Sequence, residues 1–125
     1  MDLSKPAPQS EPLRFKGWQA SAFVYPDRVE FKRIWLSRLG GNRSGTVLLA
    51  DVLKIHHVPP TRFVNGWVHL MTAEDPGALR AASMTAGQQP AGNPRVILFT
   101  WNQRDTFTKF VAAVEAAWRE SHPGL

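Results

Sequence analysis

Apolar and polar residues alternate in short runs through most of this chain, a pattern typical of β-strands that bury one face. These runs predict strands over residues 15–25, 28–36, 46–49, 52–58, 67–72 and 95–101. Between them stand residues that favour turns or cannot donate to a strand ladder, such as Pro26-Asp27, the GGNRSG stretch at 40–45 and Pro59-Pro60. The first two thirds of the sequence therefore predict short antiparallel strands.

The second run carries an irregularity. Ile34 and Leu36 fall out of step with Val29 and Phe31, which predicts a β-bulge near Lys32-Arg33. Asp51 is expected to mark a corner between two strands, and residues 73–94, rich in small residues and Gln, are expected to form a long surface loop.

A helix is predicted over residues 103–120. Asn102 is the expected N-cap. Three residues later, the carboxylate of Asp105 would be stabilised by the positive end of the helix dipole. One apolar stripe follows at helical spacing, made of Phe107, Phe110, Val111, Val114, Ala117 and Trp118. Strands followed by a single terminal helix predict a mainly β fold, an antiparallel β-sandwich or open barrel of six to seven strands capped by the helix.

The N-terminal residues differ from the rest. Residues 1–13 hold three prolines and almost nothing apolar, so we expect a disordered arm followed by a single domain over 14–121. The first residues do not resemble a signal peptide, and no apolar run approaches the roughly 18 residues of a membrane span. We therefore expect no transmembrane segment.

The composition limits the reactions and binding sites that the chain can support. The chain has no cysteine, which excludes disulfides, thiolate metal sites and a cysteine nucleophile, and which suits a cytoplasmic location. Neither a G-x-S-x-G nor an H-E-x-x-H motif is present, and GGNRSG lacks the lysine and spacing of a P-loop. These observations predict a protein that is not an enzyme, with no catalytic residues, no cofactor and no metal.

Positive charge is concentrated in one stretch. The net charge is +5, and residues 28–43 hold five Lys or Arg against Glu30 alone, a local balance of +4. This stretch either keeps the protein soluble or docks an acidic protein or an anionic surface. The candidate partner-binding residues are Arg33, Trp35, Arg38 and Arg43, because arginines beside an aromatic side chain are enriched at binding hot spots. A small basic nucleic-acid-binding domain is the alternative, and homo-oligomerisation stays open.

Two histidines are expected to face each other. If the strands at 52–58 and 67–72 pair so that residue numbers sum to 125, Ile55 meets Leu70 and His56 meets His69. This register keeps the aliphatic side chains on one face. The pair is then either an ordinary exposed pair or a site for metal binding or pH sensing.

The order of elements resembles pleckstrin-homology-like (PH-like) domains, in particular the bacterial families found in actinobacteria and their phages. The resemblance covers residues 15–120 and rests on order and spacing. The segments that carry it are Gly17, VYPDRVEF at 24–31, VLLADVLKI at 47–55, GWVHL at 66–70, and RVILF at 95–99 with Gln103, Phe107 and Phe110. It implies a non-enzymatic module for protein–protein association, at or near a membrane in some cases. It does not imply inositol phosphate binding, because the turn at 25–27 is short and acidic.

Overall fold

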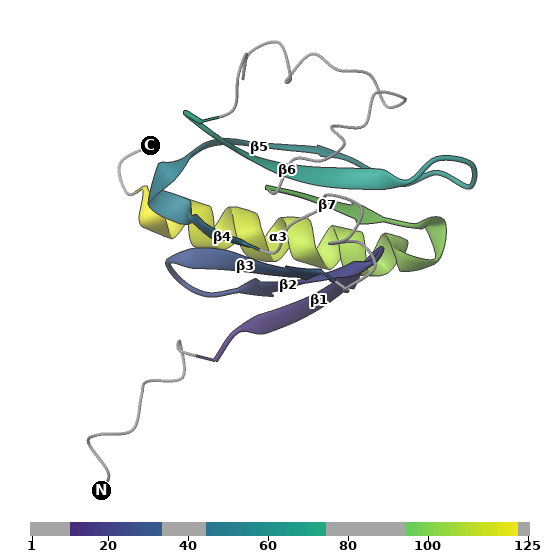
Figure 1. The fold of residues 1–125 in the computed structure, drawn as a ribbon, viewed down its shortest axis with the longest axis horizontal. Helices are drawn as coiled ribbons and strands as arrows, with labels where there is room; N and C mark the ends of the chain where they lie inside the picture. The colour runs from purple at the N-terminus through teal and green to yellow at the C-terminus, as the bar shows by residue number, and fades with distance from the viewer. Residues whose placement is uncertain (1–10, 34–44, 75–94, 123–125) are drawn as a thin grey trace, which may run out of the picture.

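Two antiparallel sheets and one long helix form the part of the chain that this computed structural model describes, residues 11–33, 45–74 and 95–122 (Figure 1). The first sheet has the order β1-β2-β3-β4 and the second the order β5-β6-β7. The elements are β1 (Leu13–Gly17), β2 (Ala20–Val24), β3 (Arg28–Arg33), β4 (Gly45–Leu48), η2 (Leu49–Asp51), β5 (Val52–Val58), β6 (Gly66–Thr72), β7 (Val96–Phe99), η3 (Trp101–Gln103) and α3 (Arg104–Ser121). The predicted mainly β sandwich of six to seven strands with a C-terminal helix is confirmed.

The single strand predicted over residues 15–25 is wrong, because this segment forms the β1–β2 hairpin. Gly17 pairs with Ala20, and the chain reverses through Trp18 and Gln19, whose φ is 56°. The alternation of apolar and polar residues continues across the turn, and neither of its two central positions, Trp18 and Gln19, is a glycine or asparagine. Leu13, which the sequence assigned to the arm, is the first residue of β1 and pairs with Val24; residues 1–10 lie outside the described part.

The β2–β3 turn lies at Pro26-Asp27 as predicted, where the Tyr25 N–H donates to the Arg28 carbonyl (2.8 Å). The bulge predicted near Lys32-Arg33 is absent from the pairing of β3 with β2, which is regular through Arg33. The predicted strand over 28–36 ends at Arg33 in the described part, and Ile34 and Leu36 lie outside it. A register shift occurs elsewhere, between Val52 and Lys54 of β5.

The pairing of β5 with β6 follows the predicted register. Ile55 lies opposite Leu70 and His56 opposite His69. One face of this sheet joins the core through Val68, Leu70 and Ile97. The opposite face of the sheet is also shielded from solvent, because Trp67 is fully buried and His69 is only 2% exposed.

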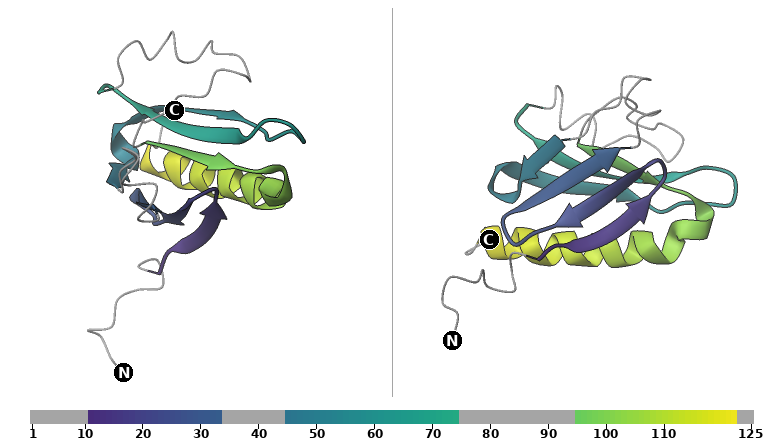
Figure 2. Two further views of the ribbon diagram at one scale, coloured as in Figure 1. Left: turned by 45° about the vertical axis from the view of Figure 1, so that its right-hand side comes forward. Right: turned by 60° about the horizontal axis from the view of Figure 1, so that its bottom comes forward.

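The helix α3 runs alongside both sheets (Figure 1 and Figure 2). Phe110, fully buried, packs its ring against Phe15 of β1 (centroids 5.4 Å apart) and Phe99 of β7 (5.7 Å). The predicted apolar stripe is confirmed, with Phe107, Phe110, Val111 and Val114 buried. This packing closes the core and fixes the helix against both sheets.

The start of the helix differs from the prediction. The expected N-cap Asn102 lies within the short 3₁₀ turn η3, and the capping box is formed by Thr100 and Gln103. Threonine is a favourable N-cap residue, and Gln103 follows Thr100 at the three-residue spacing of a capping box. The sequence therefore contained this motif, but Asn102 was the more obvious N-cap candidate. None of the helices in the described segments is long and apolar enough to cross a bilayer.

Candidate binding groove

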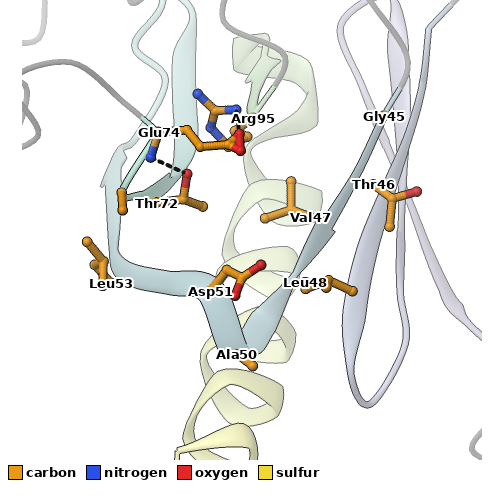
Figure 3. Close-up of a pocket in the computed structure, with 11 residues that line it drawn as sticks. Gly45, Thr46, Val47, Leu48, Ala50, Asp51, Leu53, Thr72, Glu74 and Arg95 are labelled. Carbon is orange, nitrogen blue, oxygen red and sulfur yellow. Dashed lines mark hydrogen bonds and ion pairs between the residues drawn. The ribbon is translucent and has the colours of Figure 1, made fainter.

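A groove of about 610 Å³ opens where the first sheet passes into the second (Figure 3). β4 forms one wall, and the opposite wall comes from the start of β5, the end of β6 and Arg95. η2 lies at the corner where the two walls meet, and Val47 projects between them (Figure 3). The groove therefore belongs to neither sheet alone.

The corner of the groove is held by hydrogen bonds from several elements. The fully buried Leu49 donates its N–H to the Asp27 carbonyl (2.9 Å), and its own carbonyl lies 2.8 Å from His122 Nε2 at the end of the helix. Trp118 Nε1 donates to the Val52 carbonyl at 2.8 Å. Trp118 and His122 therefore hold the two ends of this corner, at Val52 and Leu49, against the end of α3.

Exposed leucines border the groove, and in Figure 3 their side chains lie on the outer sides of its two walls. Leu48 is 49% exposed and Leu53 is 61% exposed, whereas their neighbours Leu49 and Val52 are fully buried. Adjacent residues of a strand point to opposite sides, which separates Val52 from Leu53 on β5, whereas Leu48 and Leu49 separate where β4 passes into η2. Covering the two exposed leucines would remove apolar surface from water, which favours binding of an apolar partner.

The charged side chains of the groove include two carboxylates and one guanidinium. Arg95 Nη1 lies 3.8 Å from Glu74 Oε1, and the Arg95 side chain is 17% exposed against 78% for Glu74. The Glu74 N–H donates to Thr72 Oγ1 (3.2 Å), and Asp51 is exposed at the corner. The Arg95 side chain is thus mostly buried, whereas Glu74 and Asp51 present their charge to solvent.

Within the described part of the chain, both strands at the groove lie at the edge of their sheet. Among the described strands, β4 has β3 as its one neighbour and β5 has β6. An edge strand carries backbone N–H and C=O groups that can pair with an added strand. The groove thus combines backbone hydrogen-bonding groups with exposed leucines, the two features that an extended peptide segment needs.

The structure places one of the four predicted partner-binding residues. Arg33 is half-buried, and its Nη2 donates to the Val96 carbonyl at 2.6 Å, which connects the end of β3 to β7. Burial lowers the pKa of the Arg33 guanidinium from its ordinary value. Trp35, Arg38 and Arg43 lie outside the described residues, so partner binding by the four residues stays a prediction.

The histidine pair lies on the outer face of the second sheet. His69 is buried, so the pair is not an ordinary exposed one; His56 is half-buried and packs edge-on against Trp67 (centroids 6.2 Å apart). Burial, with smaller contributions from Lys54 and the neighbouring histidines, lowers the pKa of His56. The described residues contain no group of three or more His, Asp or Glu that could hold a metal ion.

Sequence reasoning missed the groove. It identified Asp51 as a corner, but not that Leu48 and Leu53 flank it on the surface. The run VLLADVL carries the signal, because two adjacent apolar residues on one strand cannot both face the core. Their meeting in one groove depends on how the two sheets join, which local patterns do not specify.

Comparison of the chain with protein-family models, with curated proteins and with solved structures gave no match.

Proposed function

We propose that this chain is a non-enzymatic, PH-like binding module that holds an extended segment of a protein partner in the groove between β4 and β5. The observation that carries the proposal is the ordered corner at Leu49–Asp51, with an exposed leucine on each side and an edge strand at each wall. The arrangement of four strands, three strands and a terminal helix supports the PH-like part of the proposal.

An extended segment fits this site better than a compact ligand. It gains backbone hydrogen bonds from an edge strand, and its alternate side chains reach Leu48 or Leu53. The corner is already anchored by Trp118 and His122, so binding orders little of the module. The segment belongs to another protein or to a second copy of this chain.

The charge distribution supports an acidic protein partner. The basic stretch at 28–43 runs in sequence to within two residues of Gly45, which lines the groove. Acidic residues flanking the bound segment gain from that positive charge, mostly through faster association at low salt. The exposed carboxylates Asp51 and Glu74 repel phosphates and acidic side chains alike, so we expect the acidic residues of the partner beside the basic stretch and not in the groove itself.

A peptide-display selection against the full chain tests the groove. We expect the selected peptides to lose most of their affinity for Leu48→Asp and Leu53→Asp, because a charge replaces the apolar contact in each variant. Leu13→Asp is the matched control, since Leu13 is also exposed (59%) but lies at the start of β1. N-methylation of alternate peptide amides should weaken binding at the positions that pair with the edge strand.

The charge hypothesis has a separate test. Reversing Arg38 and Arg43 to Glu moves the net charge from +5 to +1, because each reversal shifts it by two. Binding of the same peptides should fall at low salt and differ little at high salt.

The groove test has its own contrary outcome. If Leu48→Asp and Leu53→Asp both leave peptide affinity unchanged, as the control Leu13→Asp should, the groove is not the binding site.

A further inference from the structure

The loop between β5 and β6 carries the most exposed large apolar side chain among the described residues. Phe63 is 95% exposed, and its neighbour Val64 is 38% exposed. The loop projects beyond the strands that it joins, at the right of Figure 1. A fully solvated phenylalanine at a projecting tip contributes nothing to the core, so its exposure requires another explanation.

The tip of this loop is an ordered turn. Thr61 Oγ1 accepts hydrogen bonds from the N–H groups of Val64 (3.0 Å) and Phe63 (3.3 Å). The Thr61 N–H donates in return to the Val64 carbonyl at 2.9 Å. Gly66 lets the chain close beneath the turn, because an added Cβ there would collide with the backbone of Val58 and Pro60. The backbone that carries Phe63 is therefore ordered, and docking the tip costs little backbone conformational entropy.

Two arginines stand behind the apolar tip. The guanidinium carbon of Arg62 lies 5.7 Å from the ring centroid of Trp101, and that of Arg104 lies 4.3 Å from the same centroid. Both arginines are exposed, and Trp101 is half-buried. Asp105, the adjacent carboxylate, lies in the first helical turn, where the helix dipole favours its charge. An exposed phenylalanine, a tryptophan and two cations thus share one end of the molecule.

We propose that this end of the molecule docks on an anionic lipid membrane, with Phe63 inserted among the lipids and Arg62 and Arg104 at the headgroups. Aromatic side chains favour the membrane interface, and arginines there gain from the negative surface potential. The convex tip favours lipid over protein. A fluid bilayer deforms around a projecting side chain, whereas a protein partner must supply a matching cavity.

This surface is separate from the groove. β5 begins at the groove with Val52 and ends at Val58 before the loop, and seven residues of strand span about 20 Å. The two surfaces can therefore be occupied together, which would hold a groove-bound partner beside the membrane. The membrane proposal does not depend on peptide binding, because its residues and its test are different.

Sedimentation with phosphatidylserine–phosphatidylcholine vesicles tests the proposal. We expect the full chain to bind these vesicles and not vesicles of phosphatidylcholine alone. Phe63→Ala should weaken binding about tenfold or more, because the ring no longer leaves water. Arg62→Gln and Arg104→Gln should each weaken it about fivefold. The matched controls Leu13→Ala, exposed on β1, and Arg119→Gln, exposed near the other end of α3, should bind like the parent.

A fluorescent label reports insertion directly. The chain has no cysteine, so Val64→Cys provides a single attachment site beside Phe63. An environment-sensitive dye there should shift to shorter wavelength on the anionic vesicles, whereas the same dye on Leu13→Cys should not. A shift on both variants would mean adsorption without a preferred face.

Two further results would overturn the proposal. The first is no binding of the parent chain to the anionic vesicles. The second is a loss in the arginine variants with none in Phe63→Ala, which indicates electrostatic adsorption without insertion. If the parent chain fails to bind the vesicles but binds a single-stranded oligonucleotide in a way that depends on Phe63, the tip binds nucleic acid instead, since bases stack on exposed rings.

Discussion

Gln103 joins the start of the helix to the turn between β1 and β2, because its Nε2 donates a hydrogen bond to the Gly17 carbonyl at 3.1 Å. The other end of the same amide, Oε1, accepts the Thr100 N–H at 3.0 Å as part of the capping box. One side chain therefore both caps the helix start and connects it to the first sheet.

Replacement of Gln103 should separate these two roles. Gln103→Ala removes both hydrogen bonds and should lower the free energy of unfolding by about 1–3 kcal/mol. Gln103→Glu keeps the acceptor for Thr100 but replaces the donor with a carboxylate oxygen that the Gly17 carbonyl oxygen repels, so its loss of stability reports the contact with Gly17 alone. Urea denaturation of the two variants and the parent measures the difference; equal midpoints for all three would mean that Gln103 contributes neither role.

Phe110 should be among the most sensitive positions of the core. It is fully buried between Phe15 and Phe99, so Phe110→Ala leaves a cavity and should cost about 3–5 kcal/mol. The adjacent Lys109 is exposed, and Lys109→Ala should change stability by no more than about 0.5 kcal/mol. Thermal melts of both variants test this contrast. A Phe110→Ala variant that melts with the parent would mean that the helix does not pack on the sheets.

Two glycines offer a matched test of how the sheets meet. A Cβ added at Gly17 would lie 2.6 Å from the Leu98 carbonyl oxygen and 2.9 Å from the Ile97 side chain. Gly17→Ala should therefore force β1 away from β7 and cost about 1–3 kcal/mol. A Cβ added at Gly45 meets nothing within 4 Å, so Gly45→Ala should melt close to the parent. The reverse order of melting temperatures would contradict this contact between the two sheets.

The pairing of His56 with His69 was predictable from the sequence because one register keeps Ile55 and Leu70 on the same face, and two prolines limit where the loop begins. The turn at Trp18 and Gln19 was not, since strand-like alternation passes through it. The groove and the exposure of Phe63 depend on tertiary structure. The groove forms where the two sheets meet, and the exposure of Phe63 depends on which elements lie next to its loop. The periodicity of apolar residues along the chain predicts neither of these.

Arg33 and its neighbour Lys32 should respond differently to the same substitution. Arg33 is half-buried and donates to the Val96 carbonyl, so Arg33→Glu loses the bond and places an acid between the sheets. We expect a loss of about 1–3 kcal/mol. Lys32 is exposed, and Lys32→Glu, which makes the same change in charge, should stay within about 0.5 kcal/mol. Urea denaturation compares them, and equal losses would mean that the hydrogen bond to Val96 does not stabilise the fold.

His56 should make the fold less stable in mild acid. Burial is the main cause that lowers its pKa below the ordinary value of 6.5, followed by the charges of Lys54, His69 and His57. Within the described residues, its buried Nδ1 has no hydrogen-bond partner, so a protonated ring would carry an unsatisfied N–H. The folded state therefore favours the neutral imidazole.

The direction of the pH effect follows from linkage. Below about pH 6.5 the unfolded chain binds a proton at His56 more readily than the folded chain does, so stability falls as the pH falls through that range. Above it both states hold the ring neutral and the effect disappears. His56→Gln should flatten the decline of the urea midpoint between about pH 7 and about pH 5 relative to the parent. If the two chains lose stability in parallel over that range, protonation of His56 is not coupled to folding, and the decline comes from other groups.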